Sequence, residues 1–297
     1  MVVMQLYAHA ARLMSHEGYQ PGSTVDPASF PTREATPEAI ELIPTKESTP
    51  DVELRNIDEA AQALAHGEIV VMRLYTLGLL IDGTNEEALQ RLFEAKQIPY
   101  ERALQGNRPI VSILPSPQYR EGLIAIERHH KDVQGLLGGD DHDLLTCEGH
   151  ALFYRVHVAS QRDYLRIPLI AEEPTGERSM VLLWHDNPYV RLLEEKAREY
   201  KGGDFLLTGS SANPTGQSQP TLVEDLHASI LPYIATVVDL QDDHINAVGL
   251  EKRGAIPIIN LVGHPPTIMR SSPMYEPVPA HAMLQSLLGY TQDPQAA

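Results

Sequence analysis

The regular part of the chain alternates short apolar runs with segments of helical period. Apolar runs occur at 68–72, 109–114, 151–158, 164–167, 206–208 and 236–240, and helical patterns occur at 57–66, 85–96, 190–200 and 222–228. Apolar runs of this length, bounded by Gly, Pro and Asn, are typical of strands, and Asn85 is placed to cap the helix that follows it. This alternation predicts an α/β or α+β sandwich built on one main sheet.

Proline-rich segments flank this body on both sides. Six prolines between positions 21 and 50 prevent a long helix there. We therefore expect an N-terminal extension over 1–55, a single main domain over 56–263, and a proline-rich tail over 264–297 that caps the body or folds over a cleft.

The charge balance restricts the partners. The chain has 297 residues, with 23 Lys and Arg against 40 Asp and Glu, giving a formal net charge of −17. Such a chain repels nucleic acid at long range, so any RNA contact needs a local basic patch, whereas a small anion in a pocket remains compatible. Cys147 is the single cysteine. With no signal-peptide pattern and no run long enough to span a bilayer, the sequence predicts a cytoplasmic protein without membrane contact.

The stretch 206–216 combines a strand with a sharply polar turn. Two leucines and a threonine lead into Gly209, Ser210 and Ser211, then Asn213-Pro214, then Gly216. Hydroxyl groups and amides that converge at a strand end suit a phosphate or another anion. The alternative is a polar strand-to-helix loop in which Ser218 or Thr221 caps the following helix.

The order of several short motifs is more specific than any one of them. The helix 86–96 ends in Lys96-Gln97-Ile98-Pro99, Arg108-Pro109 opens a strand, and Leu165-Arg166-Ile167-Pro168 follows. Ser211-Ala212-Asn213, Thr236-Val237-Val238-Asp239 and Arg253-Gly254 complete the series. In this order and spacing the chain resembles the YrdC-like family, the threonylcarbamoyl-adenylate synthases and their relatives, over about residues 56–260.

The resemblance implies a fold and a reaction. It implies a twisted, mixed-sheet open α/β sandwich with a basic cleft. The implied activity is nucleotidyl transfer, in which bicarbonate, an amino acid (threonine by default) and ATP form a carbamoyl-adenylate and release pyrophosphate. ATP would carry Mg²⁺ with it, and a tRNA, a tRNA-modification complex or other double-stranded RNA would approach through the cleft.

The resemblance also assigns nucleotide-binding residues. Lys96 and Arg108 match the family's catalytic cations at the phosphates. The further matches on the nucleotide side are Ser210, Ser211, Asn213, Arg166, Thr236 and Arg253. Taken without the resemblance, Lys96 and Arg253 read as helix-end or surface cations, and Arg166 as an internal partner of Glu172 or Glu173.

The amino-acid side departs from the family pattern. The family's hydroxyl-rich segment with an aromatic ring before Gly-Leu is replaced by 72–79, in which only Gly78 and Leu79 agree, and Ile98 replaces an arginine. Loss of tuned hydrogen-bonding groups changes substrate discrimination strongly. We expect Arg73, Tyr75 and Thr76 to line an altered substrate pocket, although Arg73 also fits a solvent-facing charge and the other two fit packing roles. The alternatives are a non-catalytic relative that binds nucleotide or RNA, and an enzyme of carbamoyl transfer or acyl-adenylate hydrolysis.

Other polar clusters are assigned to the surface. The stretch 140–150 holds Asp, His and Cys side chains without helical spacing, which favours a solvated acidic loop over a metal site. His129-His130 is likewise expected at the surface.

Overall fold

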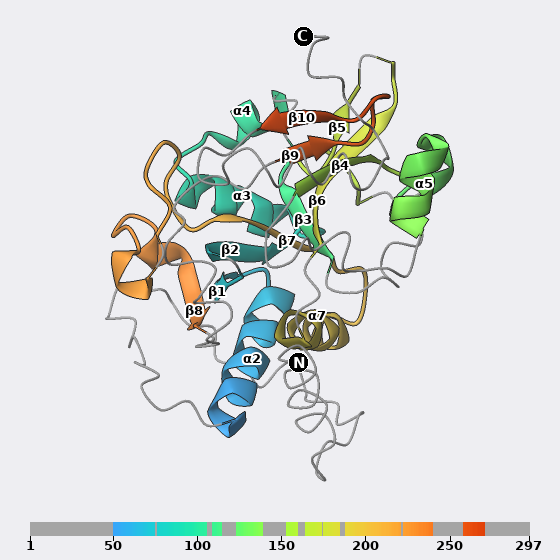
Figure 1. Cartoon of the computed structure of the whole chain (residues 1–297). Helices are drawn as coiled ribbons and strands as arrows, with labels where there is room; N and C mark the ends of the chain where they lie inside the picture. Colours follow the sequence, from blue (N-terminus) through green and yellow to red (C-terminus); the bar gives the residue numbers. More distant parts are fainter. Residues whose placement is uncertain are drawn as a thin grey trace.

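The computed structural model describes residues 50–74, 76–105, 109–114, 123–138, 153–159, 164–173, 175–184, 188–220, 222–239 and 258–270. These residues form one mixed sheet with helices on its two faces (Figure 1). The α/β architecture on one main sheet, predicted from the alternation of apolar runs and helices, is confirmed.

The sheet runs through ten strands in the described residues. They are β1 (Ile69–Arg73), β2 (Leu77–Asp82), β3 (Val111–Leu114), β4 (Phe153–His157), β5 (Ala171–Glu172), β6 (Arg178–Trp184), β7 (Leu207–Ser211), β8 (Ile234–Val238), β9 (Ile258–Asn260) and β10 (Thr267–Arg270). The order is β10-β9-β4-β6-β3-β7-β2-β1-β8, with β5 paired to β6. The pairs β1–β8, β3–β6 and β4–β9 are parallel, and the others are antiparallel.

Helices cover both faces of the sheet. The described helices are α2 (Pro50–Ala65), α3 (Glu86–Ala95), α4 (Tyr100–Gln105), α5 (Lys131–Gly138) and α7 (Pro188–Lys201), with short 3-10 turns η3 (Ile126–Arg128), η4 (Val223–Asp225) and η5 (Leu231–Tyr233). In Figure 1, α2 and α7 lie together on one side of β1, β2 and β7, and α3 lies on the other. No helix among the described residues is long and apolar enough to cross a membrane.

Strand β2 divides the core between the two faces. All six of its residues are buried. Leu77, Leu79 and Ile81 belong to the cluster that contains the apolar face of α3, whereas Leu80 belongs to the cluster with α2 and α7. Successive side chains of β2 therefore point into the two core layers in turn, as expected for a strand covered by helices on both sides.

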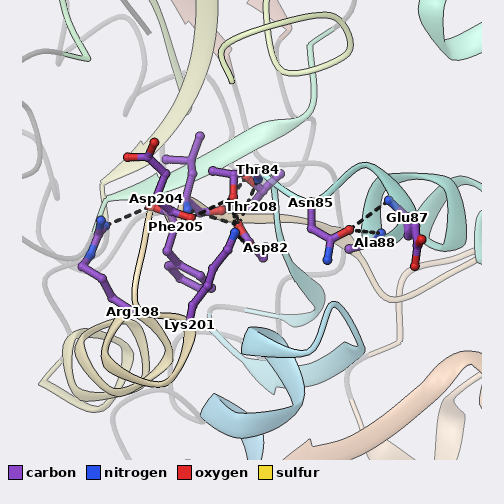
Figure 2. Close-up of polar contacts among 11 residues, drawn as sticks. Asp82, Thr84, Asn85, Glu87, Ala88, Arg198, Lys201, Asp204, Phe205 and Thr208 are labelled. Atoms are coloured by element: carbon purple, nitrogen blue, oxygen red, sulfur yellow. Dashed lines mark hydrogen bonds and ion pairs between the residues drawn. The ribbon is translucent and has the colours of Figure 1, made fainter. Parts of the chain in front are cut away.

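A buried ion pair fastens α7 to the end of β2 (Figure 2). Asp82 is fully buried, and its carboxylate pairs with Lys201 from the last turn of α7. The Thr84 amide and hydroxyl both donate to Asp82 Oδ1, at 2.9 and 2.8 Å. Asn85 then caps α3 by accepting from the amides of Glu87 (2.9 Å) and Ala88 (3.2 Å). The end of β2 is thus joined to α7 and to the start of α3.

Several elements differ from the sequence predictions. The helices 57–66, 85–96 and 190–200, with the cap at Asn85, are confirmed, whereas the strand at 164–167 is wrong because these residues form turns. The helix at 222–228 is reduced to η4. Helix α2 begins at Pro50, and β10 pairs with β9.

Candidate anion-binding site

Lys96 stands at the C-terminal cap of α3. The Gln97 amide donates to the Glu94 carbonyl and the Ile98 amide to the Phe93 carbonyl, both at 2.9 Å. Gln97 has a φ of 58°. This is a Schellman motif, with glutamine in the left-handed position that glycine usually occupies. The motif ends the helix and fixes the backbone from which the Lys96 side chain extends.

The Lys96 ammonium group lies among oxygen atoms from the end of β7 and the turn after it. Nζ donates to the Ser211 carbonyl oxygen (2.7 Å) and lies 3.2 Å from Ser211 Oγ and 3.3 Å from Asn213 Oδ1. The Thr215 amide donates to the Lys96 carbonyl at 3.1 Å. The structure therefore brings together Lys96, Ser211 and Asn213, which the sequence grouped on the nucleotide side.

The turn that carries Asn213 is held by its own hydrogen bonds. The Ala212 amide donates to the Leu77 carbonyl (2.9 Å), which extends the ladder between β2 and β7. Asn213 Nδ2 donates to the carbonyls of Pro214 (3.2 Å) and Gln217 (2.6 Å), so that its Oδ1 faces Lys96. The acceptor is thus positioned before any ligand arrives.

Burial makes the positive charge of Lys96 costly. Lys96 is 7% exposed, and desolvation lowers its pKa from 10.5 to about 8. Its three oxygen partners are uncharged, and no carboxylate in the described part of the chain forms an ion pair with Nζ. A buried cation without a counter-charge is stabilised by an anion in contact with it. The Ser211 hydroxyl can rotate to donate to the same anion. The site is suited to a phosphate or carboxylate group.

Ser210 and Thr236 are not part of the contacts around Nζ. Ser210 lies on β7 opposite Leu79 and next to Ser211. Thr236 lies opposite Val70, whose side chain belongs to the cluster with α2 and α7. Cross-strand partners share a face, and α3 lies on the other one, so Thr236 is separated from Lys96 by the sheet.

Arg166 lies at the other end of α3. Its Nη2 pairs with Glu86 Oε2 at 2.5 Å, and the Tyr100 hydroxyl donates to Glu86 Oε1 at 2.9 Å. Glu86 and Lys96 are ten residues apart along the helix, about 15 Å of helical rise. The partner of Arg166 is therefore Glu86 rather than Glu172 or Glu173.

Two of the residues predicted for the amino-acid side, Arg73 and Thr76, make internal contacts. Arg73 is 6% exposed, and its Nε lies 2.6 Å from Asp239 Oδ1, so the interpretation as a solvent-facing charge is wrong. This pair forms where the parallel strands β1 and β8 end. The Thr76 hydroxyl accepts a hydrogen bond from Gln219 Nε2.

Some predicted residues lie outside the described ranges. These are Tyr75, Arg108, Arg253 and the acidic stretch 140–150. Among the described residues, no group of three His, Cys, Asp or Glu side chains is placed to hold a metal ion.

Sequence reasoning missed two partner residues and the burial of one histidine. Asp239 ends the Thr-Val-Val-Asp motif, and Arg73 directly follows the apolar run 68–72. If the two strands predicted there were assumed to be parallel neighbours, their ends would meet and the two charges would pair. Gln219 carries no such signal, because its contact joins two segments 143 residues apart. His129, expected at the surface, is buried.

Comparison with known proteins supports the fold. No protein-family model and no curated protein sequence matches the chain. Solved structures do match. Sua5 from P. abyssi, as a variant, aligns with a TM-score of 0.53 at 19% identity, covering 74% of this chain and 57% of that one. A hypothetical protein from Streptococcus mutans aligns with a TM-score of 0.54 at 14% identity, covering 77% and 91%.

A third match is to a much longer chain, of which the alignment covers 30%. Full-length HypF, in a phosphate- and nucleotide-bound form, aligns with a TM-score of 0.52 at 13% identity, covering 75% of this chain and 30% of that one. The chain thus spans just over half the length of Sua5 and under a third of HypF. The protein has the YrdC-like fold. The resemblance read from the sequence motifs is confirmed at the level of the fold.

Proposed function

We propose that the protein binds ATP at Lys96 and acts as a nucleotidyltransferase that joins bicarbonate, an amino acid and ATP into a carbamoyl-adenylate. The observation that carries this proposal is the buried Lys96 ammonium group, which has only neutral acceptors around it. HypF was solved with phosphate and nucleotide, and Sua5 from P. abyssi was solved in complex with L-threonine. Ligands of both kinds are therefore reasonable for this fold.

The site chemistry fits the charge changes of such a reaction. The amine nitrogen of the amino acid bonds to the carbon of bicarbonate, a C–O bond breaks and water leaves, which gives a carbamate. A carbamate oxygen then forms a bond to the α-phosphorus of ATP, the bond from that phosphorus to the bridging oxygen of the β-phosphate breaks, and pyrophosphate leaves with the electron pair. Negative charge shifts onto the leaving group, and Lys96 in a low-dielectric site would stabilise it. Mg²⁺ would arrive with the nucleotide and share this role.

The second substrate is proposed to differ from threonine. Arg73 is paired with Asp239, and Thr76 accepts from Gln219. These two of the three predicted substrate contacts are therefore engaged within the protein, and a substrate would have to compete with their internal partners. Threonine remains the default to be tested first.

The test is amino-acid-dependent turnover. The protein is incubated with ATP, Mg²⁺, bicarbonate and each amino acid in turn, and pyrophosphate and carbamoyl-adenylate are measured. We expect pyrophosphate release with one amino acid or a small set. Lys96→Ala and Asn213→Ala should weaken ATP binding at least tenfold, whereas Lys131→Ala, an exposed lysine on α5, should not change it. Unchanged ATP affinity in Lys96→Ala would contradict the assignment of Lys96 to the ATP site.

A second candidate function is nucleotide binding without catalysis, as in a regulatory or accessory protein. The internal pairing of Arg73 favours it, because a charged group in the altered segment 72–79 is already neutralised. Tight ATP binding through Lys96 without pyrophosphate release for any amino acid would select this candidate. A tRNA or a tRNA-modification complex is the proposed downstream partner in either case.

A further inference from the structure

The His129 side chain lies between β4 and the end of β9. These strands are parallel, with Arg155 level with Asn260, and the Leu261 amide donates to the Arg155 carbonyl at 2.9 Å. In a regular parallel ladder the next hydrogen bond would run from the His157 amide to the Leu261 carbonyl. The imidazole ring of His129 takes this place. Its Nδ1 lies 3.0 Å from the Leu261 carbonyl oxygen, and its Nε2 accepts from the His157 amide at 3.1 Å.

These two partners define the protonation state of the ring. A carbonyl can only accept and an amide can only donate, so Nδ1 carries the proton and Nε2 carries the lone pair. An imidazolium has N–H groups on both nitrogens, and its Nε2–H would face the N–H of His157. His129 is 4% exposed, so water does not readily replace the lost partner. The neutral ring completes the ladder, and the protonated ring cannot.

Titratable groups from several elements face the ring. Desolvation by burial lowers the pKa of His129 below its ordinary 6.5, and the His157 ring on β4, 4.8 Å away between centroids, acts in the same direction. The hydrogen bond to the Leu261 carbonyl acts in the opposite direction, as do the carboxylates of Glu127 on η3 and Glu177 before β6. Nearby, His130 stacks on His264 of the β9–β10 connection at 3.8 Å, and Arg155 pairs with Glu173 at 2.7 Å.

The sign of the pH effect follows from this shift. Because the folded ring has the lower pKa, the opened state binds protons more readily. The hydrogen bonds that join His129 to Leu261 and His157 therefore contribute their full stability above about pH 6.5, and this contribution weakens as the pH falls below that value.

We propose that His129 is an acid-sensitive latch that holds the β9–β10 hairpin against β4. When the ring is neutral, it joins Leu261 to His157 and the hairpin is docked at that end of the sheet (Figure 1). Protonation at Nε2 breaks the hydrogen bond to the His157 amide and releases residues 258–270. The latch is separate from the nucleotide site, because β6 and β3 lie between β4 and β7, the strand that ends in Ser211.

The test is hydrogen–deuterium exchange of the full chain between pH 7.5 and 5.0, corrected for the intrinsic pH dependence of exchange. Protection of peptides from 258–270 should fall as the pH drops below about 6.5, by at most about tenfold per pH unit, while α2 and α7 keep theirs. His129→Gln is the informative variant, because its amide can donate to Leu261 and accept from His157 but does not titrate. It should keep the hairpin protected down to pH 5. His227→Gln makes the same change at an exposed histidine and should behave like the wild type.

Three results would overturn the proposal. The first is a wild-type protein in which protection of the hairpin does not change with pH. The second is a folded His129→Gln protein that still releases the hairpin in acid. The third is a His130→Gln protein that no longer releases it, which would assign the pH response to the stacked His130–His264 pair. If His129→Gln does not fold, long-range ¹H–¹⁵N NMR of the wild-type ring decides. A neutral Nδ1–H ring at pH 7.5 supports the latch, and the other tautomer or a charged ring contradicts it.

Discussion

The low pKa of Lys96 predicts that anion binding takes up a proton. In the free protein the pKa is about 8, against an ordinary value of 10.5. A bound phosphate supplies the missing counter-charge and should return the pKa at least to its ordinary value. At pH 7 the ammonium group is already charged, so binding takes up almost no proton there. At pH 9 most of the free protein has a neutral amine, and binding takes up close to one proton.

The magnitude follows from the size of the shift. The difference of 10.5 − 8 = 2.5 in pKa corresponds to about 3 kcal/mol, or about 300-fold in affinity. ATP affinity should therefore be level from pH 7 to 8 and then fall about tenfold per pH unit up to about pH 10.5. Phosphate groups titrate near pH 6, so the ligand itself does not change charge in this range.

Isothermal titration calorimetry in buffers of different ionisation enthalpy measures both the affinity for ATP and the number of protons taken up on binding. Lys96→Arg keeps a charge that does not titrate in this range and should give pH-independent affinity, and Lys131→Met should show the wild-type profile. A wild-type affinity that stays level to pH 10, with no proton uptake at pH 9, would refute the assignment of Lys96 as the anion-binding cation. If Lys96→Arg does not bind ATP, the proton count of the wild type still decides.

Three further predictions concern stability, each measured by chemical denaturation. Glu194 pairs with Arg198 at 2.9 Å, yet burial raises its pKa from 4.5 to about 7. Because loss of this ion pair offsets part of the gain, Glu194→Gln should stabilise the fold at pH 8 by less than about 3 kcal/mol, and the gain should vanish as the pH falls to 4.5. Asp82→Asn breaks the buried pair with Lys201 and should destabilise by about 3 kcal/mol; a loss below about 1 kcal/mol would contradict this role. Gln97→Gly relieves the left-handed backbone and should stabilise by about 0.5 kcal/mol, whereas Gln97→Ala, which keeps a Cβ, should not.

Local sequence patterns predicted much of the fold. The cap at Asn85, the amphipathic helix after it and the apolar runs of β1 and β7 were readable because capping and periodicity act over a few residues. Strand β2 was missed, because 72–79 was interpreted as a substrate loop. Its continuous burial depends on helices packed on both faces, and that packing is not a local property.

The candidate site divides in the same way. Ser211 and Asn213 were singled out from a polar turn, and Lys96 from its place at the end of a helix within an ordered series of motifs. The sequence could not show that Lys96 would lack a carboxylate partner, or that Arg166 would pair with Glu86 and Arg73 with Asp239. Which carboxylate neutralises which cation depends on positions separated by 80 to 166 residues, of which the longest is the Arg73–Asp239 separation.

By itself the sequence determined the alternation of strands and helices, the cap at Asn85 and the residue chemistry of the polar turn after β7, because these follow from spacing, caps and side-chain type. Only the tertiary structure decided how charges and protons are distributed. In the folded protein Lys96 is buried among neutral oxygen atoms, Arg73 pairs with Asp239, and the His129 ring lies between two strands. The physical reason is that desolvation and pairing depend on what the fold brings within a few ångströms, and the linear order of residues does not contain that distance.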